Sequence, residues 1–120
     1  MDHKTNIHEL KDKVKKFCDE RDWDQHHNPK DLAIAITLEA AELLELFRYK
    51  SNKEMEDLFN DEAKRQEIAE EAADILHMLL RFSQKYGIDL TTELGKKMDK
   101  NEKKYPVDKC KGSNKKYTEL

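Results

Sequence analysis

Apolar residues recur at intervals of three and four positions along most of the chain, with charged residues between them. This spacing places them on one face of an α-helix, whereas a half-buried strand would show strict alternation. The first such stretch spans residues 6–22 and carries Ile7, Leu10, Val14 and Phe17. The same spacing predicts three further long helices and one short helical piece, at residues 28–48, 61–86 and 90–104 and at residues 51–58.

Residues with strong positional preferences mark the ends of these helices. Asn28 and Pro29 form a helix start, because asparagine caps the first turn and proline fits the first helical position. Asp31 follows in the first turn, where a carboxylate interacts favourably with the positive end of the helix. Gly87 is placed to end the third long helix and Pro106 the last one. We therefore expect an all-α fold, a four-helix bundle.

The composition supports few tight turns and a small core. The 120 residues include only three Gly and two Pro, and 41% of them are charged. A chain of this length fits one domain that buries a limited apolar area, so we expect copies of the chain to associate and complete the core. Chain length leaves a dimer and a tetramer open, and we favour the tetramer. We expect the domain at residues 1–106 and a mobile, lysine-rich tail at 107–120, which lacks apolar periodicity.

Neither a membrane span nor a disulfide framework is indicated. No apolar run approaches the roughly 18 residues of a spanning helix, and the first four residues lack the basic-then-apolar order of a signal peptide. We expect a cytoplasmic protein with no membrane partner. Cys18 and Cys110 have no zinc-type spacing, so both are expected as reduced thiols.

The net charge of -3 conceals an asymmetry between the C-terminal stretch and the rest of the chain. Residues 96–116 hold nine Lys against three acidic residues, so the rest of the chain is strongly acidic. A basic stretch could bind nucleic acid, but only Tyr105 and Tyr117 lie near these lysines as stacking partners, and the protein as a whole is acidic. We favour a solvated helix end in which one or two lysines contact phosphate groups.

Carboxylates stand on or beside the apolar faces of two predicted helices. Glu39 takes a position in the apolar seam of the second helix, and Glu42 lies three residues later, on the same patch of helix surface. Glu71 and Asp74 repeat this spacing beside the seam of the third helix. Like charges in a poorly hydrated site destabilise the fold unless a cation lies between them. Mg²⁺ prefers oxygen ligands such as these carboxylates. Other carboxylates nearby are read as the solvated helix edge, namely Glu45, Glu67 and Glu70.

Other metal sites are less well supported by the sequence. Asp74 and His77 have the acidic-x-x-His spacing of di-iron helical bundles, but such sites need two copies of that motif and the chain has one. His26 and His27 are adjacent and lack a third ligand in sequence for zinc.

Four blocks of residues, in order, resemble a known family. The blocks cover residues 21–32, 39–47, 70–76 and 97–106 and read RDWDQHHNPKDL, EAAELLELF, EEAADIL and KMDKNEKKYP. Together they resemble the all-α nucleotide pyrophosphohydrolases of the MazG-like superfamily, and within it they are most similar to the dCTP pyrophosphatase type. The likeness extends over most of the chain, from residue 10 to residue 106.

The resemblance implies a magnesium-dependent enzyme that cleaves a nucleoside triphosphate between its α and β phosphates, with dCTP or a close analogue among its best substrates. Glu39, Glu42, Glu71 and Asp74 match the metal-binding pattern, and Glu39 also matches the position that activates the attacking water. The positions that line the nucleotide are matched by Trp23, His27, Lys30, Tyr49, Asn101, Lys104 and Tyr105. The chain departs from close relatives at Met78, where they carry a tyrosine that stacks on the base.

A second class of function fits the apolar faces alone. Four amphipathic helices would also serve a non-catalytic module for oligomerisation or partner binding. Binding of divalent metal by the carboxylates separates the two hypotheses, because a scaffold has no reason to show it.

Overall fold

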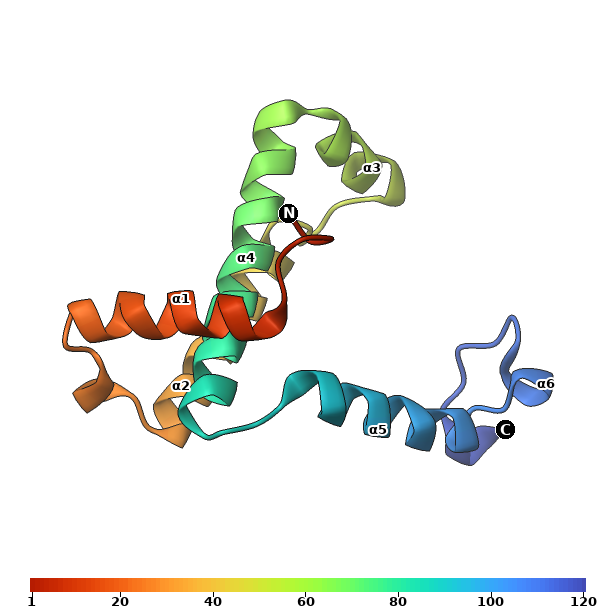
Figure 1. Cartoon of the computed structure of the whole chain (residues 1–120). Helices are drawn as coiled ribbons and strands as arrows, with labels where there is room; N and C mark the ends of the chain where they lie inside the picture. The colour runs from red at the N-terminus through yellow and green to blue at the C-terminus, as the bar shows by residue number, and fades with distance from the viewer. The chain divides into compact units, whose positions relative to one another are not determined.

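The structure, a computed structural model, describes residues 1–120 and contains no strand (Figure 1). Two short 3₁₀ turns, Asp24–His26 and Tyr117–Glu119, accompany the helices. The α-helices are α1 (Ile7–Glu20), α2 (Pro29–Glu45), α3 (Asn52–Asn60), α4 (Glu62–Lys85), α5 (Leu90–Lys104) and α6 (Val107–Cys110). The all-α prediction is confirmed, but with six α-helices rather than a simple set of four. No helix is long and apolar enough to cross a bilayer.

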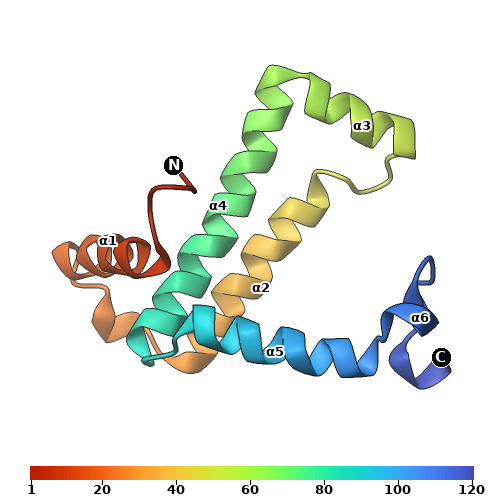
Figure 2. The ribbon, with the colours of Figure 1, turned by 45° about the vertical axis from the view of Figure 1, so that its right-hand side comes forward.

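The chain divides into two compact units, Met1–Gly87 and Ile88–Leu120. In the first unit, α4 is the central helix and contacts α1, α2 and α3. Helices α2 and α4 run side by side in opposite directions, linked by α3, and α1 crosses α4 near its C-terminal half (Figure 2). Any side chain on the facing sides of α2 and α4 therefore has close neighbours from the other helix.

The predicted helix starts are found in the structure. The Asn28 side chain accepts a hydrogen bond from the backbone N–H of Asp31 at 2.8 Å, as an N-cap does. At the start of α3, Ser51 and Glu54 bond reciprocally to each other's backbone N–H, which is a complete capping box. Gly87 follows the end of α4 with φ of 64°, a left-handed conformation that glycine adopts without steric cost.

Helix α2 ends earlier than the sequence predicts, at Glu45 instead of residue 48. The backbone N–H of Phe47 bonds to the carbonyl of Leu44 rather than to the carbonyl four residues back, so the last turn tightens. Tyr49 then takes a φ of 61°, in the left-handed region, and reverses the chain without a glycine.

The core of the first unit is small. Its buried apolar side chains are Val14 and Cys18 from α1, Leu32 from α2 and Leu80 from α4. Arg81 is also buried, although it carries a charge. Many large apolar side chains on α2 and α4 remain exposed, so one copy of the chain leaves much apolar surface uncovered.

The second unit contains α5, α6 and the final 3₁₀ turn. Tyr117 in that turn lies edge-on to Tyr105, with ring centroids 6.0 Å apart, and the Lys104 ammonium lies 4.8 Å from the Tyr117 ring centroid. The residues expected to form a mobile tail thus include a short helix and a turn that packs on the end of α5. The expected domain boundary after residue 106 stays a prediction.

Candidate active site

Three carboxylates meet where α2 and α4 lie side by side. Glu39 and Glu42 come from α2 and Glu71 from α4, and each offers one oxygen within 4.8 Å of the others. The spacing of three residues puts Glu39 and Glu42 on one side of α2, and the packing of α4 along α2 brings Glu71 to meet them. The structure therefore brings together three of the four predicted metal-binding residues in one cluster.

Two oxygens of this cluster are buried without a partner. Oε2 of Glu39 and Oε2 of Glu71 are inaccessible to solvent and accept no hydrogen bond. A buried carboxylate oxygen normally has a hydrogen-bond donor or a metal ion as its partner, because leaving it unpaired costs free energy. The donor set consists of carboxylate oxygens with no sulfur or nitrogen, which fits a hard divalent cation such as Mg²⁺.

The electrostatics of the cluster point the same way. Burial raises the pKa of Glu39, and the neighbouring carboxylates of Glu42, Asp74 and Glu71 raise it further. The pKa of Glu71 is raised by burial and then by its contacts with Glu42. A cation at the cluster would oppose these shifts, because its charge favours the ionised form of each carboxyl group.

Asp74 lies next to this cluster but does not belong to it. It is exposed and borders an open cavity of about 450 Å³ together with Glu39. The cavity lies against α1, α2 and α4, and its other lining residues are Lys13, Val14, Phe17, His77 and Met78. A ligand in this cavity would touch one half-buried carboxylate, Glu39, one exposed carboxylate, Asp74, and an apolar wall. The metal-binding role of Asp74 stays a prediction.

An aromatic contact chain connects this cavity to the loop between α1 and α2. The Phe17 ring meets Trp23 edge-on at 5.6 Å between centroids and meets His77 edge-on at 5.5 Å. Trp23 remains partly exposed, so it keeps a face available for stacking. His77 packs against Phe17 at the cavity and is not part of the carboxylate cluster.

The same loop is fastened to α4 by two cations that the sequence reasoning missed. Arg81 Nη2 donates to Asp24 Oδ1 at 2.8 Å and Arg81 Nε donates to His27 Nδ1 at 2.9 Å. Lys85 Nζ donates to Asp24 Oδ1 at 2.9 Å. Hydrogen bonds from Lys85 and the charges of both cations lower the pKa of Asp24. The signal in the sequence was a single arginine within the apolar stretch at the end of α4.

The other residues expected to bind substrate do not line the cavity beside Glu39 and Asp74. Lys30 is exposed in the first turn of α2. Tyr49 is 89% exposed after the end of α2, with the Arg48 guanidinium 4.6 Å from its ring centroid. Asn101, Lys104 and Tyr105 belong to the second unit, at the exposed end of α5. The structure therefore leaves the joint action of these residues as a prediction.

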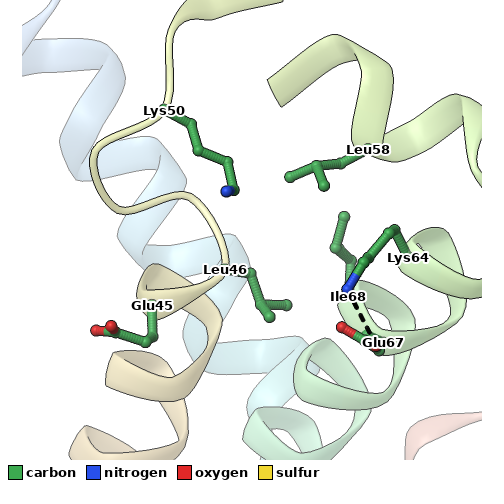
Figure 3. Close-up of a pocket in the computed structure, with 7 residues that line it drawn as sticks. All are labelled: Glu45, Leu46, Lys50, Leu58, Lys64, Glu67 and Ile68. Atoms are coloured by element: carbon green, nitrogen blue, oxygen red, sulfur yellow. Dashed lines mark ion pairs between the residues drawn. The ribbon is translucent and has the colours of Figure 1, made fainter. Parts of the chain in front are cut away.

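A smaller cavity lies at the other end of α2 and α4, beside α3 (Figure 3). It has a volume of about 210 Å³ and is lined by Glu45, Leu46, Lys50, Leu58, Lys64, Glu67 and Ile68. Glu67 is paired with Lys64 at 3.6 Å, and Glu45 with Arg48 at 3.4 Å. These two carboxylates have cationic partners and do not join the three-carboxylate cluster.

The carboxylate cluster predicts an unusual dependence of stability on pH. Because folding raises the pKa of Glu39 and Glu71, the folded state binds protons more tightly than the unfolded state. In buffer with EDTA, the two carboxyl groups should stabilise the folded state most below the ordinary carboxyl pKa of about 4.3. This contribution to the free energy of unfolding should decline as the pH rises through the raised pKa values. Glu39→Gln should therefore raise the melting temperature at pH 7.5 and have little effect at pH 4.

Circular dichroism melts of the wild type, Glu39→Gln and Glu45→Gln check this. Glu45 is exposed and paired with Arg48, so its variant should not gain stability at pH 7.5. Adding Mg²⁺ should raise the melting temperature of the wild type more than that of Glu39→Gln, since a ligand of the folded state alone stabilises it. A lower melting temperature for Glu39→Gln at pH 7.5 without metal would contradict this account of the cluster.

Comparison with known proteins gives a consistent result. A protein of Rattus norvegicus named dCTP pyrophosphatase 1 is 38% identical over 104 residues, and the Homo sapiens protein of that name is 36% identical. Each alignment covers 87% of this chain, which spans 61% of the length of those relatives. The crystal structure of a pyrophosphatase from Archaeoglobus fulgidus superposes with a TM-score of 0.77 at 40% identity, covering 83% of this chain and 92% of that one. The sequence profile of the MazG-like family matches residues 34–120, so the match extends past Pro106, where the resemblance was expected to end. The chain belongs to the MazG-like family.

Proposed function

We propose that this protein is a magnesium-dependent nucleoside triphosphate pyrophosphohydrolase, which converts a (deoxy)nucleoside triphosphate to the monophosphate and pyrophosphate. The observation that carries the proposal is the cluster of Glu39, Glu42 and Glu71 with two buried oxygens that lack partners. The names of the relatives, dCTP pyrophosphatase 1 and pyrophosphatase, support the same class of reaction.

Glu39, Glu42, Glu71 and Asp74 are the residues that would hold Mg²⁺. The ion would polarise the phosphate oxygens and shield the charge of the leaving pyrophosphate. Negative carboxylates repel a triphosphate, so the cluster needs a cation to bind this substrate at all.

Glu39 is suited to accept a proton from the attacking water. Its buried position and acidic neighbours raise its pKa, and a carboxylate with a raised pKa is a stronger base. In the proposed reaction, Glu39 takes a proton from the water, and the water oxygen forms a new bond to phosphorus. The bond between that phosphorus and the oxygen that bridges the α and β phosphates breaks. Pyrophosphate and the monophosphate then leave intact.

The family resemblance assigns the binding of the nucleotide to seven further residues. Trp23 and Tyr49 offer exposed aromatic faces for stacking, and His27, Lys30, Asn101, Lys104 and Tyr105 offer polar groups. Deoxynucleotides, with dCTP or a close analogue among the best, are the proposed substrates. Met78 borders the cavity beside Asp74, so a thioether lies where close relatives are expected to place a tyrosine ring.

Removal of any cluster carboxylate should abolish most of the activity. Glu39→Gln, Glu42→Gln, Glu71→Gln and Asp74→Asn should each lower kcat about 100-fold or more, because each removes a metal ligand or the base. Helical circular dichroism should stay unchanged, since the amides have the same shape. Glu45→Gln is the matched control and should keep normal turnover. Near-normal turnover in two of the four variants would refute the assignment and favour a non-catalytic helical module.

The products distinguish this reaction from other phosphate hydrolysis. A panel of canonical and modified (deoxy)nucleoside triphosphates with Mg²⁺ should yield monophosphate and pyrophosphate, measured by chromatography. Within the panel, dCTP or a close analogue should have one of the highest values of kcat/KM. Release of inorganic phosphate with a diphosphate product would show that the β–γ bond is cleaved and that the proposal is wrong.

We also propose that the active form is a homo-oligomer, a tetramer built from dimers. Ile34, Leu38 and Leu44 on α2 and Leu76 and Leu79 on α4 are all exposed in a single copy. Apolar side chains in such number on two packed helices favour burial against another surface.

Light scattering coupled to size exclusion checks the assembly. The protein should elute at about four times the mass of one chain at micromolar concentration, and dilution should lower activity and mass together. A fully active monomer would refute the proposal.

A further inference from the structure

Arg81 is the most buried charged side chain in the protein, and the proposed reaction does not use it. It is 2% exposed on α4, one turn after the cavity residues His77 and Met78. Its guanidinium donates through Nε to His27 Nδ1 at 2.9 Å, through Nη2 to Asp24 Oδ1 at 2.8 Å and through Nη1 to Gln84 Oε1 at 2.6 Å. A buried charge with three directed bonds fixes the position of whatever it contacts.

The bond to His27 determines where the proton of that imidazole lies. Arginine cannot be deprotonated in proteins and has no acceptor, so the Arg81 N–H must donate and His27 Nδ1 must accept. A neutral imidazole that accepts at Nδ1 carries its proton at Nε2. Because Nδ1 is occupied by Arg81, the Nε2–H is the polar group that the ring can offer to a ligand.

The charges around His27 keep the ring neutral. Arg81 and Lys85 on α4 and His26 and Asp24 in the 3₁₀ turn all act on it. Burial of the ring lowers the pKa of His27 most, the two α4 cations lower it further, and only Asp24 opposes them. A doubly protonated ring would also place an N–H at Nδ1 against the Arg81 donor, so the geometry excludes it.

The loop that carries His27 is held at two points, one of which is a contact with a residue of the cavity wall. Trp23 packs on Phe17, which lines the cavity, and Asp24 is held by Arg81 and Lys85. We propose that Arg81 is a positioning residue that holds His27 as a fixed Nε2–H donor for an acceptor oxygen of the nucleoside triphosphate. This proposal rests on the proposed function for the identity of the ligand. It assigns His27 to binding and excludes it as the base, because its free nitrogen already carries the proton.

The tautomer can be measured without any activity. Long-range ¹H–¹⁵N NMR spectra of metal-free protein distinguish protonated from unprotonated ring nitrogens, and the His27 signals are identified by their loss in His27→Gln. At pH 7 the wild type should show Nε2 protonated and Nδ1 unprotonated. Arg81→Met should allow both tautomers and raise the pKa of His27. Lys85→Met is the matched control, because Lys85 contacts Asp24 but not the ring, and its His27 should keep the wild-type tautomer.

A wild-type His27 protonated at Nδ1, or at both nitrogens at pH 7, would overturn the proposal. The wild-type spectrum decides this point even if Arg81→Met fails to fold, which circular dichroism would reveal.

Kinetics with the proposed substrates test the functional consequence separately. His27→Gln places an amide N–H near the position of Nε2 and should keep KM within about threefold of the wild type, whereas His27→Ala should raise KM about tenfold, equivalent to roughly 1.4 kcal/mol. Arg81→Met should also raise KM with little change in kcat, since uniform binding is lost. A loss of kcat with unchanged KM would overturn the binding role. If no triphosphate is hydrolysed by the wild type, the proposed function fails, while the NMR result still decides the tautomer.

Discussion

Packing of α2 along α4 brings carboxylates of both helices into one poorly hydrated site, where they repel each other. The other contacts of the first unit must outweigh this repulsion. The unpaired oxygens of Glu39 and Glu71 make the contact unfavourable in the absence of a cation. Yet α4 also packs against α1 and α3, so the acidic contact is held in place by the helices around it. The fold thus supplies the stability that its acidic site removes, a pattern common where a site is built for a ligand.

One side of α4 carries the chemistry of this unit in sequence. Glu71, Asp74, Met78, Arg81 and Lys85 follow at alternating spacings of three and four, so they lie along one stripe of the helix. The stripe is acidic at its beginning, apolar in the middle and basic at its end. Its acidic end meets Glu39 and Glu42 of α2, and its basic end holds the loop with Asp24 and His27. A single rigid helix therefore sets the distance between the cluster and the loop.

Local patterns in the sequence predicted the helices and the acidic cluster but not the basic end of this stripe. Periodicity and capping residues located α1 to α5 to within a few residues, and the position of Glu39 in an apolar seam singled out the carboxylates. The end of α2 was misplaced because the chain after Glu45 tightens into a turn that no glycine or proline marks in the sequence. Arg81 was missed because a lone arginine in an apolar stretch does not reveal its partners, and His27 and Asp24 lie 54 and 57 residues away in sequence.

The two thiols differ in a way that makes one of them a natural reporter of motion. Cys18 lies on the buried side of α1 and is completely inaccessible, and burial raises its pKa, so the reactive thiolate is scarce in the folded protein. Cys110 in α6 is only half-buried. A thiol reagent should modify Cys110 quickly and reach Cys18 only when α1 separates from α4. The rate of that second modification measures how often α1 opens, on the protein as it stands.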